Sequence, residues 1–211
     1  MAGVASCAFA LGELSREDIM EYVTSDWHLN HTEVIEYEKR PFQTVAEMNK
    51  AILKNWRDVV SSSDTVFHLG DVFLRTPKEQ AEKIVKNLPG KKVLVLGNHD
   101  RSRSLSWWRD VGFIEVYKYP IIVRGFYILS HEPAYVGPSM PYVNVHGHTH
   151  SESSDNPHKV NVSVEVTDYR PVSLDDVVSR FGIEITARKI LSEFFDPKLV
   201  LSSSHRTEET E

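Results

Sequence analysis

At 211 residues, with 41% hydrophobic and 26% charged residues, the chain has the length and composition of one soluble globular domain with a sizeable core. The net charge of −6 argues against a protein that grips long nucleic acid through its general field, although bound dications could still present positive charge to a nucleotide. The single cysteine, Cys7, excludes an intrachain disulfide and fits a reducing compartment, and no apolar run reaches the length of a membrane span.

The first residues do not fit the pattern of the rest of the chain. Residues 4–12 are mildly apolar, but no basic region precedes them, so a secretory signal is not expected. Met20 stands just before the first strand-like run. We therefore expect residues 1–19 to be an appended leader, either a short helix or disordered, residues 20–198 to form the main domain, and residues 199–211 to be a polar tail.

Strands and helices alternate through the first half of the chain. Short apolar, β-branched runs predict strands over residues 22–25, 65–69 and 93–96. Between the first two, Thr44-Val45-Ala46-Glu47 is a capping box that opens a helix with apolar positions at helical spacing. Thr76-Pro77-Lys78-Glu79 opens a second helix, with Pro77 at its first position and Glu79 closing the box.

Shorter elements follow in the second half. A short helix is predicted over residues 104–111, and residues 113–124 and 126–130 are predicted to form the two strands of a hairpin joined at Gly125. The remaining predicted elements are strands over residues 142–145 and 159–166 and helices over residues 173–181 and 183–198.

Five of the strand-like runs lead into side chains that can bind a metal or transfer a proton. These endings are Asp26-Trp27-His28, Gly70-Asp71, Gly97-Asn98-His99-Asp100, His131 and His146-Gly147-His148-Thr149-His150. Because ligands bind outside the carboxyl ends of strands in an open α/β sheet, we expect these side chains at one rim. A single histidine of this kind could equally be a surface or core residue, but five such endings are not expected by chance. Imidazole, amide and carboxylate without thiolate suit Mn, Fe, Co, Ni or Zn.

The order of these endings resembles the signature of the calcineurin-like metallophosphoesterases. That signature is Asp-x-His, Gly-Asp, Gly-Asn-His-Asp/Glu, a lone His and Gly-His-x-His, and all five blocks occur between Asp26 and His150. The resemblance covers roughly residues 20–182 and is closest to small bacterial and phage members that consist of the catalytic core only. It implies an α/β fold, a four-layer α-β-β-α sandwich of two mixed sheets flanked by helices, with a dinuclear metal site at the strand ends.

The resemblance also implies roles for individual residues. It implies two divalent metal ions per chain, with Mn favoured and Fe, Ni, Co or Zn as alternatives. The implied ligands are Asp26, His28, Asp71 and His150 for one metal and Asp71, Asn98, His131 and His148 for the other, so that Asp71 bridges both. His99 is not a ligand in this scheme, and it would protonate the leaving oxygen or stabilise the charge that builds on it.

Further residues are candidates for substrate contact. His31 is either a solvated surface residue or a substrate contact, and Arg75, Arg101 and Arg103 are equally compatible with phosphate contact and with plain surface charge. Arg75 lies four residues after Asp71, which is the spacing of a phosphate-clamping arginine in the protein-phosphatase branch of the family. Leu74 stands where that branch has an aspartate, which argues against a protein phosphatase.

The function that the resemblance implies is hydrolysis of a phosphate ester. A phosphodiester of nucleotide size, including a cyclic nucleotide, is favoured because no capping domain is visible to hold a long polymer. The alternatives are a phosphomonoesterase and a non-catalytic scaffold that binds a protein partner, but a scaffold would lack ligands and none is missing here. We expect a protein without membrane association, in the cytoplasm of a bacterial cell or phage-infected host, and a homo-oligomer is compatible with the sequence.

Overall fold

The computed structural model describes residues 19–137, 139–156 and 158–180. Ile19 apart, the leader predicted over residues 1–19 lies outside these ranges, as do the helix predicted over residues 183–198 and the tail predicted over residues 199–211. Within the described ranges no helix is long and apolar enough to cross a membrane.

The larger of two sheets has five strands in the order β4-β3-β2-β1-β9. Its members are β1 (Glu21–Thr24), β2 (Thr65–His68), β3 (Lys91–Val95), β4 (Glu115–Tyr117) and β9 (Val172–Ser173). The first four run parallel, and only β9 is antiparallel to its neighbour β1. In the register, Thr24 is paired with His68 and His68 with Leu94, so these strands end close to one edge. The residues that follow them therefore emerge together.

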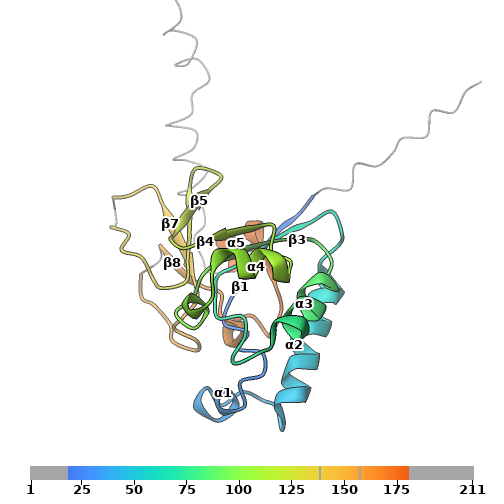
Figure 1. The fold of residues 1–211 in the computed structure, drawn as a ribbon. Helices are drawn as coiled ribbons and strands as arrows, with labels where there is room; N and C mark the ends of the chain where they lie inside the picture. Colours follow the sequence, from blue (N-terminus) through green and yellow to red (C-terminus); the bar gives the residue numbers. More distant parts are fainter. Residues whose placement is uncertain (1–18, 138, 157, 181–211) are drawn as a thin grey trace, which may run out of the picture.

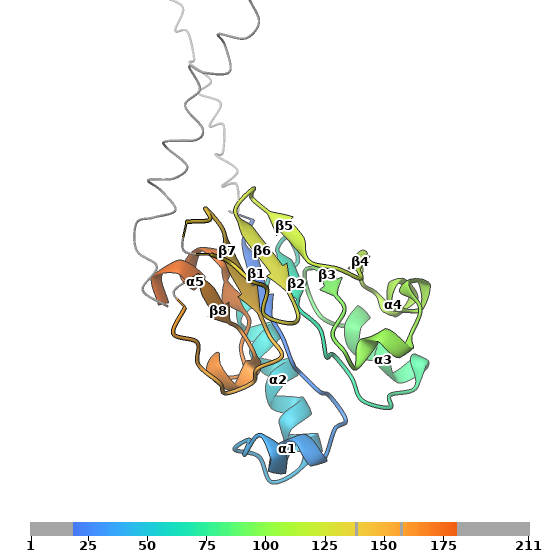
Figure 2. The same ribbon diagram turned by 90° about the vertical axis from the view of Figure 1, so that its left-hand side faces the viewer.

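The smaller sheet has four strands in the order β5-β6-β7-β8. Its members are β5 (Ile121–Val123), β6 (Tyr127–Ser130), β7 (Val143–His146) and β8 (Lys159–Asn161). The last three run parallel, and the register pairs Ser130 with His146. The chain segments beginning at His131 and Gly147 therefore also leave the sheet side by side. Figure 2 shows this sheet, in yellow to brown, lying across the blue-to-green strands of the larger sheet.

Alternation along the strands of the larger sheet divides its side chains between two cores. Val66 and Leu94 pack with buried residues of helices α2 (Val45–Val59), α3 (Lys78–Lys86) and α4 (Leu105–Val111). Their neighbours Phe67 and Val93 pack in the other direction, against buried valines and leucines of the smaller sheet. The helices α2 and α3 therefore cover one face of the larger sheet, and the second sheet covers the other (Figure 1).

Two further helices complete the described fold. Helix α5 (Leu174–Arg180) follows β9 and contributes Leu174 and Val177 to the core between the sheets. Helix α1 (Glu33–Tyr37) lies in the connection between β1 and α2. The expected architecture of two mixed sheets flanked by helices is thus confirmed.

The strand predicted over residues 113–124 is wrong, because this segment is divided between the two sheets. β4 pairs with β3 in the larger sheet, whereas β5 pairs with β6 in the smaller one. The chain crosses between the sheets at Lys118-Tyr119-Pro120, where proline cannot donate a ladder hydrogen bond. The β5–β6 hairpin itself is confirmed, with residues 124–126 between the paired strands, and its turn residues Arg124 and Gly125 both have positive φ.

The strand predicted over residues 159–166 is also wrong in its second half. β8 ends at Asn161, whose side-chain oxygen accepts hydrogen bonds from the backbone N–H and the hydroxyl of Ser163. This local side-chain turn stops the ladder, and a 3₁₀ turn over Val164–Val166 follows. The turn brings Ser163 against Ser25 at the end of β1, where the two form an isolated bridge.

The two predicted capping boxes had different outcomes. The hydroxyl of Thr44 accepts the backbone N–H of Glu47, as predicted, although the carboxylate of Glu47 accepts the N–H of Gln43 instead of that of Thr44. The box at Thr76 does not form, because its hydroxyl donates to the carbonyl of Leu74 and accepts from the side chain of Asn30. Helix α3 then begins at Lys78 without a side-chain cap.

Candidate metal centre

The residues that follow the strands adopt an unusual backbone conformation. Five of the seven predicted ligands have φ between 47° and 70°, in the left-handed region: Asp26, His28, Asp71, His148 and His150. Residues other than glycine rarely adopt this region, and such strain concentrates at functional sites. The loop after β1 is held against the loop after β2 by backbone hydrogen bonds, from the N–H of Asp26 to Gly70 (3.0 Å) and from that of His28 to Asp71 (2.9 Å).

Two glycines allow the predicted carboxylate ligands to approach the neighbouring loops. A Cβ on Gly97 would lie 2.1 Å from Oδ1 of Asp71, and a Cβ on Gly147 would lie 2.2 Å from Oδ2 of Asp26. Neither distance is compatible with a side chain. The glycines of the Gly-Asn-His-Asp and Gly-His-x-His blocks are therefore needed for close packing around these two carboxylates.

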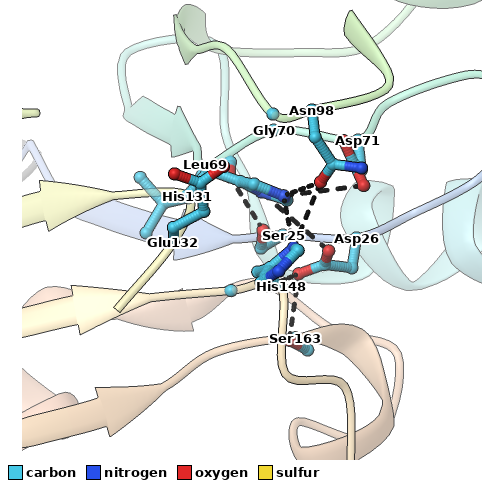
Figure 3. A network of polar contacts seen from close by, with 12 residues as sticks. Ser25, Asp26, Leu69, Gly70, Asp71, Asn98, His131, Glu132, His148 and Ser163 are labelled. Atoms are coloured by element: carbon cyan, nitrogen blue, oxygen red, sulfur yellow. Dashed lines mark hydrogen bonds and ion pairs between the residues drawn. The ribbon is translucent and has the colours of Figure 1, made fainter. Parts of the chain in front are cut away.

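One group of possible metal ligands lies where the loops after β3, β6 and β7 meet, and it contains the side chains of Asn98, His131 and His148 (Figure 3). Oδ1 of Asn98 lies 2.8 Å from Nε2 of His131 and 3.1 Å from Nδ1 of His148. Oδ2 of Asp71 completes the group, 3.6 Å from Nε2 of His131. The other ring nitrogen of His131 donates to the carbonyl of Leu69 (2.7 Å), which leaves the lone pair of Nε2 directed at the group.

A second group shares Asp71 and contains Asp26, His28 and His150. Ligand atoms of Asp26, His28 and His150 all lie within 4.8 Å of one another, and Nε2 of His28 lies 3.5 Å from Oδ2 of Asp71. Oδ1 of Asp26 and Nε2 of His28 are buried and have no hydrogen-bond partner among the residues that the structure describes. Buried polar atoms of this kind are rare and call for an explanation, and a bound cation would satisfy both. The donor set therefore fits a metal ion.

The electrostatics of the centre also favour a cation. Burial, followed by the nearby carboxylates of Asp100 and Asp26, raises the pKa of Asp71 to about 8. Burial lowers the pKa of His28 and of His131, so both rings are neutral and able to act as ligands at neutral pH. A site that combines crowded carboxylates with neutral imidazoles requires either protons or metal ions to balance its charge.

Asp100 supports the centre by accepting backbone hydrogen bonds from two neighbouring loops. Its Oδ2 accepts the backbone N–H of Asp71 (2.7 Å) and that of Gly97 (2.9 Å), and its Oδ1 accepts that of Val72 (3.2 Å). The sequence marked this carboxylate only as a group capable of ligation or proton transfer. The structure shows that it ties the loop after β2 to the loop after β3.

Arg40 and Glu165 form a second support that the sequence analysis missed. Oε1 of Glu165 lies 2.9 Å from Nδ1 of His150 and accepts from the guanidinium of Arg40, which is itself buried. The same guanidinium donates to the backbone carbonyls of Asp26 (2.7 Å) and Trp27 (2.9 Å). Burial opposes protonation of His150, but the hydrogen bond and the charge of Glu165 raise its pKa. No single-sequence signal links Arg40 and Glu165, which are 125 positions apart.

Ser163 is a further supporting residue without a sequence signal. Its hydroxyl donates to Oδ2 of Asp26 (2.9 Å), and the backbone N–H of His148 donates to the same oxygen (2.8 Å). These two hydrogen bonds fix the carboxylate so that Oδ1 remains free to bind a cation.

His99 stands at the exposed side of the centre. Its backbone N–H donates to Oδ1 of Asp71 (3.0 Å), and its side chain, 38% exposed, places Nε2 3.9 Å from Oδ2 of the same residue. The ring lies close enough to His28 and Asp71 to join a cluster around a cation. The geometry therefore permits either a ligand or a proton donor, and measurement of metal content distinguishes them.

The candidate substrate residues occupy three different settings. His31 lies beside the centre, with its Nδ1 3.3 Å from Nδ1 of His28. Arg75 is exposed and borders a cavity that His99 also lines. Arg101 forms an ion pair of 3.0 Å with Glu132 at the surface.

The raised pKa of Asp71 predicts how the stability of the metal-free protein depends on pH. Up to the folded-state pKa of about 8, Asp71 retains a proton that the unfolded chain has lost, so stability falls as pH rises and levels off above about pH 8.5. His150, whose pKa is raised, acts in the same direction. The buried histidines with lowered pKa, such as His28 and His68, oppose this trend only below about pH 6.5, where the unfolded chain gains their protons.

Thermal melting in a chelator tests this expectation. The free energy of unfolding should fall by about 2 kcal/mol between pH 6.5 and 8.5. Saturating Mn should remove the fall, because the cation takes the place of the proton. Asp71→Asn should show a much flatter profile in the chelator. A metal-free wild type whose stability rises over this range would contradict the charge balance described above.

Several known proteins are similar to this chain in sequence or in fold. The model of a family described as calcineurin-like phosphoesterase matches residues 22–207. An uncharacterised protein of Methanocaldococcus jannaschii is 38% identical over 168 residues, which are 74% of this chain and 88% of that protein. The gene 66 protein of Mycobacterium phage D29 is 27% identical over 68% of this chain and 87% of its own. The crystal structure of a protein of unknown function from Aquifex aeolicus superposes with a TM-score of 0.63 at 27% identity, covering 77% of this chain and all of that one.

Proposed function

Because this chain belongs to the calcineurin-like phosphoesterases and is thus a metal-dependent phosphoester hydrolase, we propose that it cleaves phosphodiesters of nucleotide size. The proposal extends to the metal ligands and the proton donor, and it is supported by the two donor groups that share Asp71 and by the cavities beside them.

The two donor groups suggest which residues hold the metal ions. We assign Asp26, His28, Asp71 and His150 to one ion and Asp71, Asn98, His131 and His148 to the other. When bound, two such ions polarise the phosphoryl oxygens and supply a nucleophile at neutral pH. The donor set of oxygen and imidazole nitrogen without sulfur suits Mn, and also Fe, Co, Ni or Zn.

The protein's own groups supply orientation and a proton. Asp100, Ser163 and the Arg40–Glu165 pair hold the ligand loops in place, so the ligands do not reorganise when substrate enters. His99, at the exposed side, is positioned to donate a proton from its side chain to the leaving oxygen. The P–O bond to the leaving group breaks, a P–O bond to water oxygen forms, and the leaving oxygen takes up the proton.

The observation that favours a diester is the presence of two separate cavities, each of which is lined in part by residues of the centre. One, of about 460 Å³, is lined by Glu38 and by residues 148–152, which include His148 and His150. The other, of about 160 Å³, is lined by His99 and Arg75 among others. A phosphodiester carries two substituents and can occupy both cavities, whereas a monoester fills only one.

A substrate panel tests the proposal. Cyclic nucleotides, dinucleotides, bis(4-nitrophenyl) phosphate and 4-nitrophenyl phosphate would be assayed with Mn, Ni, Fe and Mg supplied separately. We expect kcat/KM to be higher for the diesters than for the monoester, with Mn among the activating ions. A clear preference for the monoester would favour a phosphomonoesterase, and the absence of any turnover with every metal would favour a protein-binding scaffold.

A further inference from the structure

We propose that the cavity on the His99 side is an anion-binding subsite for a second phosphate, carried by the leaving group of the substrate. This inference rests on the proposed diesterase function and narrows its substrate class. The preferred substrates would be short nucleotide diesters with a terminal phosphate on the departing half.

The position of the cavity relates it to the leaving group. His99 lies between the cavity and Asp71, so its ring is a wall that the cavity shares with the metal centre. If His99 donates a proton to the leaving oxygen, the rest of the leaving group must extend past it on this side. The volume of about 160 Å³ is smaller than the roughly 300–1,000 Å³ of a pocket for a whole ligand. A cavity of this size suits one compact chemical group of a substrate.

Arg75 brings a guanidinium to this cavity from a loop that is fixed relative to the centre. The backbone N–H of Leu74 donates to the carbonyl of Leu29 (3.0 Å), and the side chain of Asn30 donates to the hydroxyl of Thr76 (2.8 Å). These two hydrogen bonds fix the residues on either side of Arg75, whose own backbone φ is 47°. A strained arginine at the rim of a candidate active site, held by its neighbours, is an observation that points to a functional role.

Arg103 brings a second guanidinium from the segment that follows the Gly-Asn-His-Asp block. Cζ of the Arg103 guanidinium lies 5.0 Å from the ring centroid of Trp107, so the guanidinium stacks on the face of an aromatic ring. Trp107 and Trp108 both line the cavity, and Trp108 is almost fully buried. The stacking restrains the long side chain of Arg103 and reduces the entropy that it loses when it binds an anion.

Neither guanidinium has an acidic partner within the part of the chain that the structure describes. Among the other arginines of that part, Arg40, Arg101 and Arg124 each pair with a carboxylate. Arg57, Arg109 and Arg170 have no ion pair there either, but they do not line the cavity. In a chain with a net charge of −6, two arginines without an ion pair beside one small cavity make a local positive site. The forked guanidinium donors match the oxygens of phosphate, which identifies the ligand class.

Three matched dinucleotides test the subsite. Thymidylyl-thymidine (TpT) would be compared with its forms bearing a 5′-phosphate (pTpT) or a 3′-phosphate (TpTp), on full-length protein loaded with Mn. We expect one phosphorylated form to exceed TpT in kcat/KM by about tenfold, the effect of one charge-assisted hydrogen bond or more. Arg75→Gln and Arg103→Gln should each reduce this ratio toward one.

Arg109→Gln is the matched control, because Arg109 lies on the same helix as Trp107, is exposed and does not line the cavity. It removes the same charge and should retain the full preference. Equal cleavage of the three dinucleotides by the wild type, or an equal loss of preference in Arg109→Gln, would overturn the subsite while the diesterase proposal stands. Failure of the wild type to cleave any of the three dinucleotides would overturn this inference. Failure on every diester of the substrate panel as well would overturn the diesterase proposal.

Discussion

Replacement of Asp71 by asparagine is expected to weaken binding of both metal ions together and to lower turnover by about 10⁴-fold or more. The carboxylate lies in both donor groups, since its Oδ2 is 3.5 Å from Nε2 of His28 in one and 3.6 Å from Nε2 of His131 in the other. An amide oxygen in the place of Oδ2 carries no negative charge, so it is a much weaker ligand for both cations. Metal content and kcat would be measured on the same sample.

Asp168→Asn is the matched control for this variant. Asp168 also has a left-handed backbone, with φ at 53° against 57° for Asp71, but its side chain is exposed and no donor group contains it. Both substitutions therefore place asparagine in the same conformation, and only one removes a proposed ligand. If Asp71→Asn kept two ions with full affinity, Asp71 would not be the shared ligand.

His99→Ala is expected to retain both metal ions and still to lose about 10²–10⁴ in turnover, the usual contribution of a positioned acid. The loss should be large for alkyl leaving groups and small for 4-nitrophenyl esters, whose leaving oxygen needs little protonation. His148→Ala should behave differently, because its ring nitrogen lies 3.1 Å from Oδ1 of Asn98 within a donor group, and its removal should weaken metal binding directly.

Metal content and rates for both variants, on a poor and a good leaving group, distinguish the roles. Loss of a metal ion in His99→Ala would make His99 a ligand, which its proximity to His28 and Asp71 permits. An equal loss of rate on both substrates would leave charge stabilisation as its role and remove the proton donor.

The strand ends could be predicted from the sequence because each is a local pattern, an apolar run followed by a turn and a polar side chain. Parallel neighbours in a sheet end at one edge, so Asp26, Asp71 and Asn98 meet without any long-range information. The need for Gly97 and Gly147 could be predicted for the same reason, since each belongs to a local motif. The structure adds their purpose, which is to let the carboxylates of Asp26 and Asp71 approach the neighbouring loops.

The supporting residues could not be predicted because their partners are distant in the sequence. Arg40 meets Glu165 and the backbone of Asp26 only after the loop that follows β1 and the turn that follows β8 have come together. Likewise, the hydrophobic pattern of residues 113–124 is continuous, so it could not show that β4 and β5 belong to different sheets. That division depends on which strand each half pairs with.

We propose that the centre is dinuclear and that Asp71 is shared between its two ions. The most direct test is an anomalous diffraction map of crystals saturated with Mn, combined with elemental analysis of the same preparation. We predict two ions per chain, about 3.5–4 Å apart, with the carboxylate of Asp71 bound to both. A single ion at saturating Mn, or two ions that do not share Asp71, would contradict this account.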